Sequence, residues 1–143
     1  MAEKEFIVLV ILVSLLVVGC QETVESKEAE QIPTENGVTR VFSKASVNPG
    51  ESIQLKLYVN LNEGQSYYLL EEAVPKEVEI IDCGHDENNK IKMIEIQNAQ
   101  SKVYECTLKA PLEPGEYKFE GEFALEGMSK PTGIYGANTI TVQ

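Results

Sequence analysis

Residues 53–61 read Ile53-Gln54-Leu55-Lys56-Leu57-Tyr58-Val59-Asn60-Leu61. Apolar residues occupy every odd position, and polar or amphipathic residues occupy the even positions. Because successive side chains of a β-strand point to opposite faces, this alternation predicts a strand with one face on a core and the other toward water. It is the strongest strand signal in the chain, and it indicates a half-buried sheet.

The same two-residue period returns at residues 117–125. There the odd positions hold mainly aromatic and aliphatic residues, and Gly121 makes room for a close neighbour. Shorter strands are predicted at residues 38–45, 66–74, 77–83, 90–97, 102–110 and 137–142. Turn residues such as Asn48-Pro49-Gly50 and Glu113-Pro114-Gly115 separate them. Some eight short strands with no convincing helix predict an all-β domain over residues 37–143, built as a sandwich of two sheets.

One predicted strand, at residues 90–97, does not follow a simple alternation. Ile91 and Met93 lie on one parity, whereas Ile94 and Ile96 lie on the other. Such a strand either carries a bulge or is covered on both faces. The pattern alone leaves both interpretations open.

The order of several segments resembles a known type of module. These segments are Arg40-Val41-Phe42, Tyr67-Tyr68-Leu69-Leu70-Glu71-Glu72, Pro114-Gly115-Glu116-Tyr117 and Thr139-Ile140-Thr141-Val142. Together, over residues 38–142, they look like the immunoglobulin-like modules of prokaryotic secreted and surface proteins. The resemblance implies an immunoglobulin-like β-sandwich of about seven to eight antiparallel strands. It also implies an accessory or adhesive role, without enzyme residues.

The first residues predict export. Residues 6–18 form an apolar run interrupted by one Ser, shorter than the roughly 20 residues of a full membrane span. Gly19 and Cys20 follow, and polar sequence begins at Gln21. Residues 1–19 therefore read as a signal peptide, with an uncleaved N-terminal membrane anchor helix or a buried core helix as the alternatives. Either membrane interpretation leaves the rest of the chain on the extracytoplasmic face.

The end of this run resembles the lipobox of prokaryotic lipoproteins, in which the chain is cut before a cysteine whose sulfur carries a diacylglycerol. The residues that match are Val17-Val18-Gly19-Cys20. The resemblance implies lipidation of Cys20 and membrane lipid as its partner. Residues 20–36 are rich in Glu and opposed by Lys27 alone, which predicts a flexible acidic tether, although a helix over residues 21–31 is an alternative.

The overall charge excludes one class of partner. The chain holds 23 acidic residues against 12 basic ones, for a formal net charge of −11. Nucleic-acid binding relies on clustered Lys and Arg, so we predict no nucleic-acid partner.

Two cysteines remain after Cys20. In an oxidising compartment Cys83 and Cys106 are readily joined, and closing that loop would stabilise the fold by about 3 kcal/mol. Two buried free thiols are the alternative, because sequence cannot show whether the two Cα atoms come within bonding distance.

No catalytic or metal-binding constellation stands out. His85, the sole histidine, lies in an acidic turn at residues 82–89 that lacks the ordered calcium-loop pattern and offers zinc too little nitrogen or sulfur. One histidine in a turn also makes a nucleophilic triad hard to assemble. Glu71 and Glu72 point to opposite faces of a strand, so they cannot flank one bond and are expected to be exposed acids. We therefore predict no enzyme activity, no cofactor and no metal.

The function predicted from sequence is that of a non-enzymatic, lipid-anchored cell-surface interaction module, serving adhesion, envelope architecture or a membrane complex. The candidate partner-contact loop is the Gly-containing segment 126–137, with an ordinary strand connection as the alternative. It contains four residues that could meet a protein partner: Met128, Pro131, Ile134 and Tyr135. An extracellular ligand- or cation-binding lipoprotein acting through residues 82–89, and an inhibitor presenting a loop to a protease, are the alternatives.

Overall fold

The computed structural model describes residues 36–84 and 86–143, and all regular structure in these ranges is β-strand. The strands are β1 (Gly37–Phe42), β2 (Ser46–Val47), β3 (Ser52–Asn60), β4 (Tyr67–Ala73), β5 (Glu79–Asp82), β6 (Asp86–Glu87), β7 (Lys90–Ile96), β8 (Lys102–Lys109), β9 (Gly115–Lys118), β10 (Glu120–Leu125), β11 (Thr132–Gly133), β12 (Tyr135–Gly136) and β13 (Thr139–Val142). The predicted signal peptide or anchor helix, Cys20 and the tether to Glu35 lie outside the described residues. Within the described ranges nothing forms a helix that could span a bilayer.

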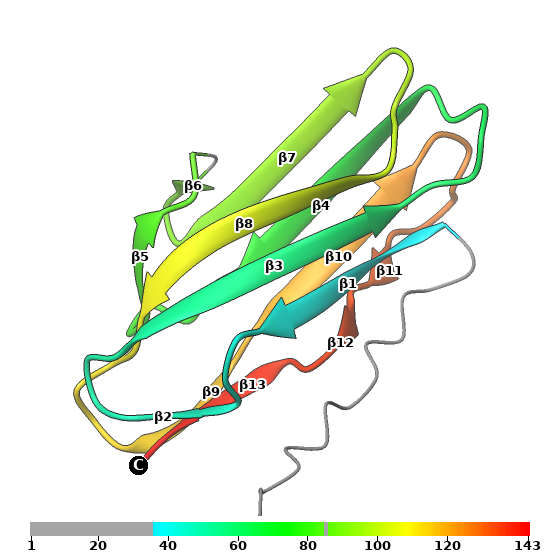
Figure 1. Ribbon diagram of the computed structural model, residues 1–143. Helices are drawn as coiled ribbons and strands as arrows, with labels where there is room; N and C mark the ends of the chain where they lie inside the picture. The colour runs from blue at the N-terminus through cyan, green and yellow to red at the C-terminus, as the bar shows by residue number, and fades with distance from the viewer. Residues whose placement is uncertain (1–35, 85) are drawn as a thin grey trace, which may run out of the picture.

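The strands form two facing sheets and a smaller third one. One five-stranded sheet has the order β12-β1-β3-β8-β5, and the other has the order β11-β10-β4-β7-β6. They make two layers in Figure 1, with β1, β3 and β8 in front of β4, β7 and β10. The third sheet, β2-β13-β9, extends the sandwich at one end. The predicted all-β sandwich is confirmed.

The pairings are antiparallel except for β1 with β12 and β2 with β13, which are parallel. The structure has more strands than the seven or eight expected, for two reasons. Four of them, β2, β6, β11 and β12, are only two residues long and carry little sequence signal. In addition, the stretch at 117–125 is divided at Phe119, so that β9 pairs with β13 while β10 pairs with β4.

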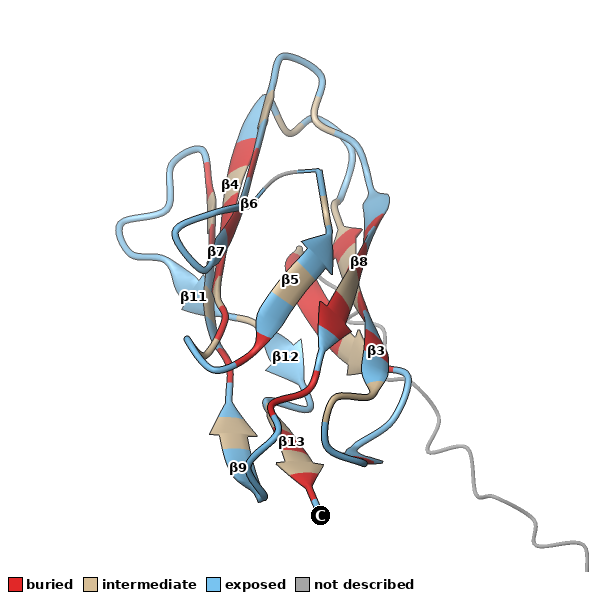
Figure 2. Cartoon of the chain, turned by 90° about the vertical axis from the view of Figure 1, so that its left-hand side faces the viewer, coloured by how far each residue is buried: buried red, intermediate tan, exposed pale blue. Residues whose placement is uncertain are grey.

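The core lies between the two layers and follows the predicted alternation. On β3 the odd residues Ile53, Leu55 and Leu57 are fully buried. Phe119 and Phe123 are buried in the same way along the 117–125 stretch. Figure 2 shows buried positions alternating with less buried ones along β4 and β8, as expected for strands with one face on a core.

The irregular parity of β7 has a different explanation from the two that the sequence suggested. The pairing of β4 with β7 runs from Tyr67↔Ile96 to Ala73↔Lys90 without a register shift, so this ladder has no bulge. Ile91 and Met93 face the core, whereas Ile94 and Ile96 are exposed. The strand therefore alternates normally and places two isoleucines on its outer face.

The two ends of the sandwich differ. At one, which we call the chain-entry end, the Asn36 carboxamide oxygen accepts a hydrogen bond from the Asn62 backbone N–H at 2.6 Å, and the Ser101 hydroxyl accepts one from the Leu61 N–H at 2.9 Å. β4 begins and β7 ends at this same end. The C-terminal residue Gln143 lies at the opposite end, where its N–H donates to the carbonyl of Val47.

Candidate functional site

An apolar strip covers part of the outer face of the sheet that contains β4, β7 and β10. We define it as Tyr67, Leu69, Ile94, Ile96 and Ala124. The exposed fractions of Ile96, Ile94 and Tyr67 are 71%, 55% and 40%, and Leu69 and Ala124 are half-buried. These side chains share one face because their positions in each strand have the same parity.

The register brings the strip residues side by side. Leu69 pairs with Ile94 on one side and with Ala124 on the other, so these three residues form one row across the sheet. Tyr67 pairs with Ile96 in a second row, nearer the chain-entry end. Cross-strand neighbours on one face have Cβ atoms about 5 Å apart, so the rows form a continuous surface.

The other exposed apolar residues do not form such a surface. Eight large hydrophobic residues are exposed in the described part of the chain, and three of them belong to the strip. The remaining five lie singly on different segments: Ile81, Val103, Leu112, Met128 and Tyr135. Single exposed hydrophobic residues are normal, whereas a contiguous patch marks a binding surface more often.

Charged residues cover the same sheet face on the side away from the chain-entry end. The Lys90 ammonium forms an ion pair with the Glu71 carboxylate, and this hydrogen bond holds the pKa of Glu71 below its usual value. Glu122 pairs with Glu71 across the sheet, and Lys92 lies opposite Glu71 on β7. The face is therefore apolar toward one end and charged toward the other, the arrangement of an interface core beside its polar rim.

A polar network beneath the strip ties β7 to β8 across the two layers. The Tyr104 hydroxyl donates to the Glu95 carboxylate at 3.2 Å, and the Lys102 ammonium donates to the same oxygen at 2.8 Å. Tyr68 and Tyr104 share a hydrogen bond between their hydroxyls at 2.5 Å, and burial raises the pKa of both. These contacts fix the end of β7 that carries Ile94 and Ile96.

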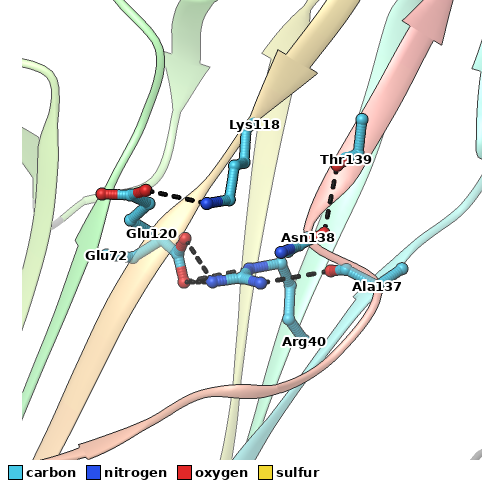
Figure 3. A network of polar contacts seen from close by, with 7 residues as sticks. All are labelled: Arg40, Glu72, Lys118, Glu120, Ala137, Asn138 and Thr139. Atoms are coloured by element: carbon cyan, nitrogen blue, oxygen red, sulfur yellow. Dashed lines mark hydrogen bonds and ion pairs between the residues drawn. The ribbon is translucent and has the colours of Figure 1, made fainter.

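A buried ion pair joins the two layers in the interior. Arg40 on β1 and Glu72 on β4 are only 2% and 0% exposed. The Arg40 Nη2 group donates to both carboxylate oxygens at 2.7 and 2.8 Å, Nε donates to one of them at 3.1 Å, and Nη1 donates to the Ala137 carbonyl at 3.2 Å (Figure 3). Burial raises the pKa of Glu72, and the charge of Arg40 opposes that rise.

This pair corrects the expectation that Glu71 and Glu72 are both exposed acids. The two residues do point to opposite faces, but Glu72 points into the core because Arg40 supplies its hydrogen bonds there. Gly121 provides the space, since a Cβ on it would overlap the Glu72 carboxylate and the Ile134 side chain. The pair has no exposed surface for a substrate, so its role is structural.

Cys83 and Cys106 are joined in the structure. Their sulfur atoms lie 1.96 Å apart and their Cα atoms 4.3 Å apart. Asp82 on β5 pairs with Thr107 on β8, so the bond links neighbouring strands of one sheet. Cys106 is buried and Cys83 packs against the core. The disulfide therefore secures the short edge strand β5 to β8.

The acidic turn at residues 82–89 is described in the structure except at one position. His85 lies outside the described residues. Among the residues that are described, no three His, Cys, Asp or Glu side chains lie close enough together to hold a metal ion. An open hollow between β5 and the β6–β7 turn is lined largely by polar residues, including Lys76, Asp86 and Asn89.

The predicted contact loop, residues 126–137, also connects the two layers of the sandwich. It contains β11, which pairs with β10, and β12, which pairs with β1, so it carries the chain from one layer to the other. Ile134 packs against the core, whereas Met128, Pro131 and Tyr135 are exposed. The structure thus separates Ile134 from the other three, and a contact role for those three stays a prediction.

Sequence reasoning did not identify the strip. The one signal for it in the sequence is the off-parity pair Ile94 and Ile96, a pattern that a bulge or a covered strand explains equally well. Tyr67, Leu69 and Ala124 join the isoleucines only through the strand register.

No protein-family model matches the chain, and no curated protein matches its sequence. Several solved structures are similar to it. A type I cohesin from Clostridium thermocellum, solved in a cohesin–dockerin complex, is 11% identical with a TM-score of 0.49, over 76% of this chain and 100% of that one. A non-cellulosomal cohesin from the archaeon Archaeoglobus fulgidus is 12% identical with a TM-score of 0.49, over 75% and 91%. The cupredoxin domain of amoB from Nitrosocaldus yellowstonii is 13% identical with a TM-score of 0.45, over 75% and 87%. No partner or activity follows from similarity at this level.

Proposed function

We propose that this chain is a non-enzymatic interaction module, held at the extracytoplasmic face of the cell membrane by lipid on Cys20, which binds a protein partner through the apolar strip. The observation that carries the proposal is the contiguous exposure of Tyr67, Ile94 and Ile96 on one sheet face. Burying apolar surface stabilises a complex by roughly 25 cal/mol per Å², so covering this surface with a partner favours binding.

A protein partner suits this surface because its apolar part adjoins a rim of both charges. Lys90, Lys92, Glu71 and Glu122 lie beside the strip and can pair with polar groups of another protein. An interface typically has an apolar centre and such a polar rim. The net charge of −11 keeps the remaining surface soluble.

The proposed anchor places the strip near the membrane. Residues 20–36 would connect the lipidated cysteine to β1, and the Tyr67–Ile96 row lies toward the chain-entry end. A flexible linker of this length has an end-to-end distance on the order of 20–25 Å. The strip would therefore lie within reach of proteins that project only a short way from the bilayer.

Photo-crosslinking in living cells tests the contact. A photoreactive amino acid at position 96 is expected to give a crosslinked protein band, because Ile96 is the most exposed residue of the strip. The matched control is position 112, because Leu112 is 76% exposed but lies apart from the strip, beside the Asn48–Gly50 turn. Equal crosslinking at positions 96 and 112, or none at either, would contradict the proposed contact face.

The anchor is tested separately by the intact mass of protein purified from native membranes. The expected mass corresponds to a chain beginning at Cys20 with a diacylglycerol attached, and Cys20→Ser is expected to abolish that modification. Recovery of the unmodified full-length chain would disprove the lipid anchor and leave the contact face to be judged by crosslinking.

A further inference from the structure

The edge of the sheet that carries the strip is open along most of β7. β6 pairs with β7 only at Lys90 and Ile91. From Lys92 to Ile96 no other strand of the described chain pairs with β7 on the side away from β4, and β7 lies at the edge of its layer in Figure 1. An uncovered edge of this kind presents backbone N–H and C=O groups to which another strand can pair.

The direction of these backbone groups follows from one hydrogen bond. The Asn89 carbonyl, directly before β7, accepts from the Val74 N–H, so the backbone groups of odd-numbered residues in this stretch point toward β4. Backbone groups alternate in direction along an antiparallel strand. The N–H and C=O groups of Lys92, Ile94 and Ile96 therefore point to the open edge, and the same three side chains lie on the outer face.

Natural sheets protect their edges with bulges, prolines or charged residues. The open part of β7 contains no proline, and its ladder with β4 has no register shift. Its charges are Lys92 on the outer face and Glu95 on the inner face, where Lys102 and Tyr104 hold Glu95, and its other two outward side chains are exposed isoleucines. We propose that this edge accepts an extended strand of the partner protein, which adds to the sheet beside β7 while its side chains cover the strip. The proposal rests on the proposed function, because it names how the partner engages that surface.

The side chains of β7 define the chemistry of the incoming strand. On the outer face, Ile96 and Ile94 favour apolar residues opposite them, and the Lys92 ammonium favours an acidic one. On the inner face, Glu95 is held by Lys102 and Tyr104, so the residue opposite it must be polar. Read from its N-terminus, an antiparallel partner strand therefore has the pattern apolar, polar, apolar, any residue, acidic. These positions lie opposite Ile96 to Lys92 in that order.

A second copy of β7 does not meet these requirements. Antiparallel pairing of two copies about Ile94 places Lys92 opposite Ile96, and pairing about Glu95 places two carboxylates opposite each other. Each copy also carries a net charge of −11, which opposes self-association. The occupant is therefore a strand from another protein.

The test uses the full chain in detergent micelles and a blocked synthetic peptide, Thr-Val-Thr-Val-Thr-Glu-Thr, which has the stated pattern. Backbone amide exchange is followed by NMR. At a peptide concentration about ten times its dissociation constant, exchange is expected to slow about tenfold at the outward amides of Lys92, Ile94 and Ile96. Amide exchange is expected to stay unchanged at Ile91 and Met93, because their backbone N–H groups already point to β4.

A charge reversal provides the matched control. Lys92→Glu is expected to weaken binding of this peptide about twofold to fivefold, and a peptide with Lys in place of Glu is expected to recover that loss on the variant. Lys92 is exposed, so the substitution leaves the fold intact. Equal binding of both peptides to both proteins would overturn the proposed side-chain pairing.

Other occupants give different results. If amide exchange at the same three residues slows as the protein concentration rises, without peptide, the edge is occupied by a second copy of the chain. Slowing caused by phosphatidylglycerol vesicles but not by peptide would assign it to lipid. Either result, or an absence of slowing at saturating peptide, overturns the proposal. Crosslinking at position 96 together with such a result would leave the proposed function standing and show that the partner covers the face without extending the sheet.

Discussion

The buried Arg40–Glu72 pair and the exposed apolar strip are opposite departures from the usual distribution of residues. The first places two charges in the core, and the second places isoleucines at the surface. The charged pair is satisfied within the chain, because Arg40 donates to both carboxylate oxygens and to a backbone carbonyl. Among residues 36–84 and 86–143, which the structure describes, none covers the outer face of the strip. Residue type alone therefore does not mark a functional surface, because a buried charge can be satisfied within the fold while an exposed apolar residue is not.

The largest expected effect comes from breaking the buried pair. Arg40→Met leaves the Glu72 carboxylate buried without its partner, which is expected to lower the free energy of unfolding by about 3–5 kcal/mol. Chemical denaturation measures the change. The matched control is Lys118→Met, since the Lys118–Glu120 pair is exposed and is expected to contribute less than about 1 kcal/mol. A similar loss in both variants would show that burial of the first pair has no energetic consequence.

Replacing both members of the buried pair shows whether the unpaired charge causes this loss of stability. Arg40→Met combined with Glu72→Leu removes both charges, and is expected to recover most of the stability lost by the single variant, because no unpaired charge remains. If the double variant were as unstable as the single one, the loss would come from packing around Arg40 and not from the unpaired carboxylate.

The disulfide is expected to have the next largest effect. Cys83→Ala with Cys106→Ala removes a link across a sequence separation of 23 residues, which should lower the free energy of unfolding by about 3 kcal/mol. Thermal unfolding with and without reductant measures it, and reductant is expected to leave the double variant unchanged. An undiminished response of the variant to reductant would contradict this assignment.

A smaller effect is expected at Gly121, which provides the space for the buried pair. Gly121→Ala places a methyl group against the Glu72 carboxylate and Ile134, and overpacking of this kind destabilises by about 1–3 kcal/mol. Gly133→Ala is the control, because a Cβ there would meet no atom within 4 Å. Equal stability of the two variants would show that the interior can shift to accommodate a Cβ.

The strip is expected to contribute least to stability. Ile94→Lys is expected to change the free energy of unfolding by no more than about 0.5 kcal/mol, because Ile94 is 55% exposed. The same substitution is expected to abolish crosslinking from position 96, because a charge at the centre of an apolar contact is left without a partner. A stability loss comparable to that of Arg40→Met would instead mark Ile94 as part of the core.

The sequence predicted the sandwich because β3 alternates without interruption and its apolar residues all reach the core. It also placed the buried residues of the 117–125 stretch, but not the division at Phe119, because a change of sheet leaves the alternation intact. The fate of Glu72 could not be predicted, since it depends on Arg40, 32 residues earlier in the chain. The strip required the register of three strands, which a period within one strand does not contain.

The described domain begins and finishes at opposite ends of the sandwich, with Asn36 at one and Gln143 at the other. A reporter fused after Gln143 would therefore sit at the far pole of the domain, clear of the β7 edge and of any bilayer that holds residue 20.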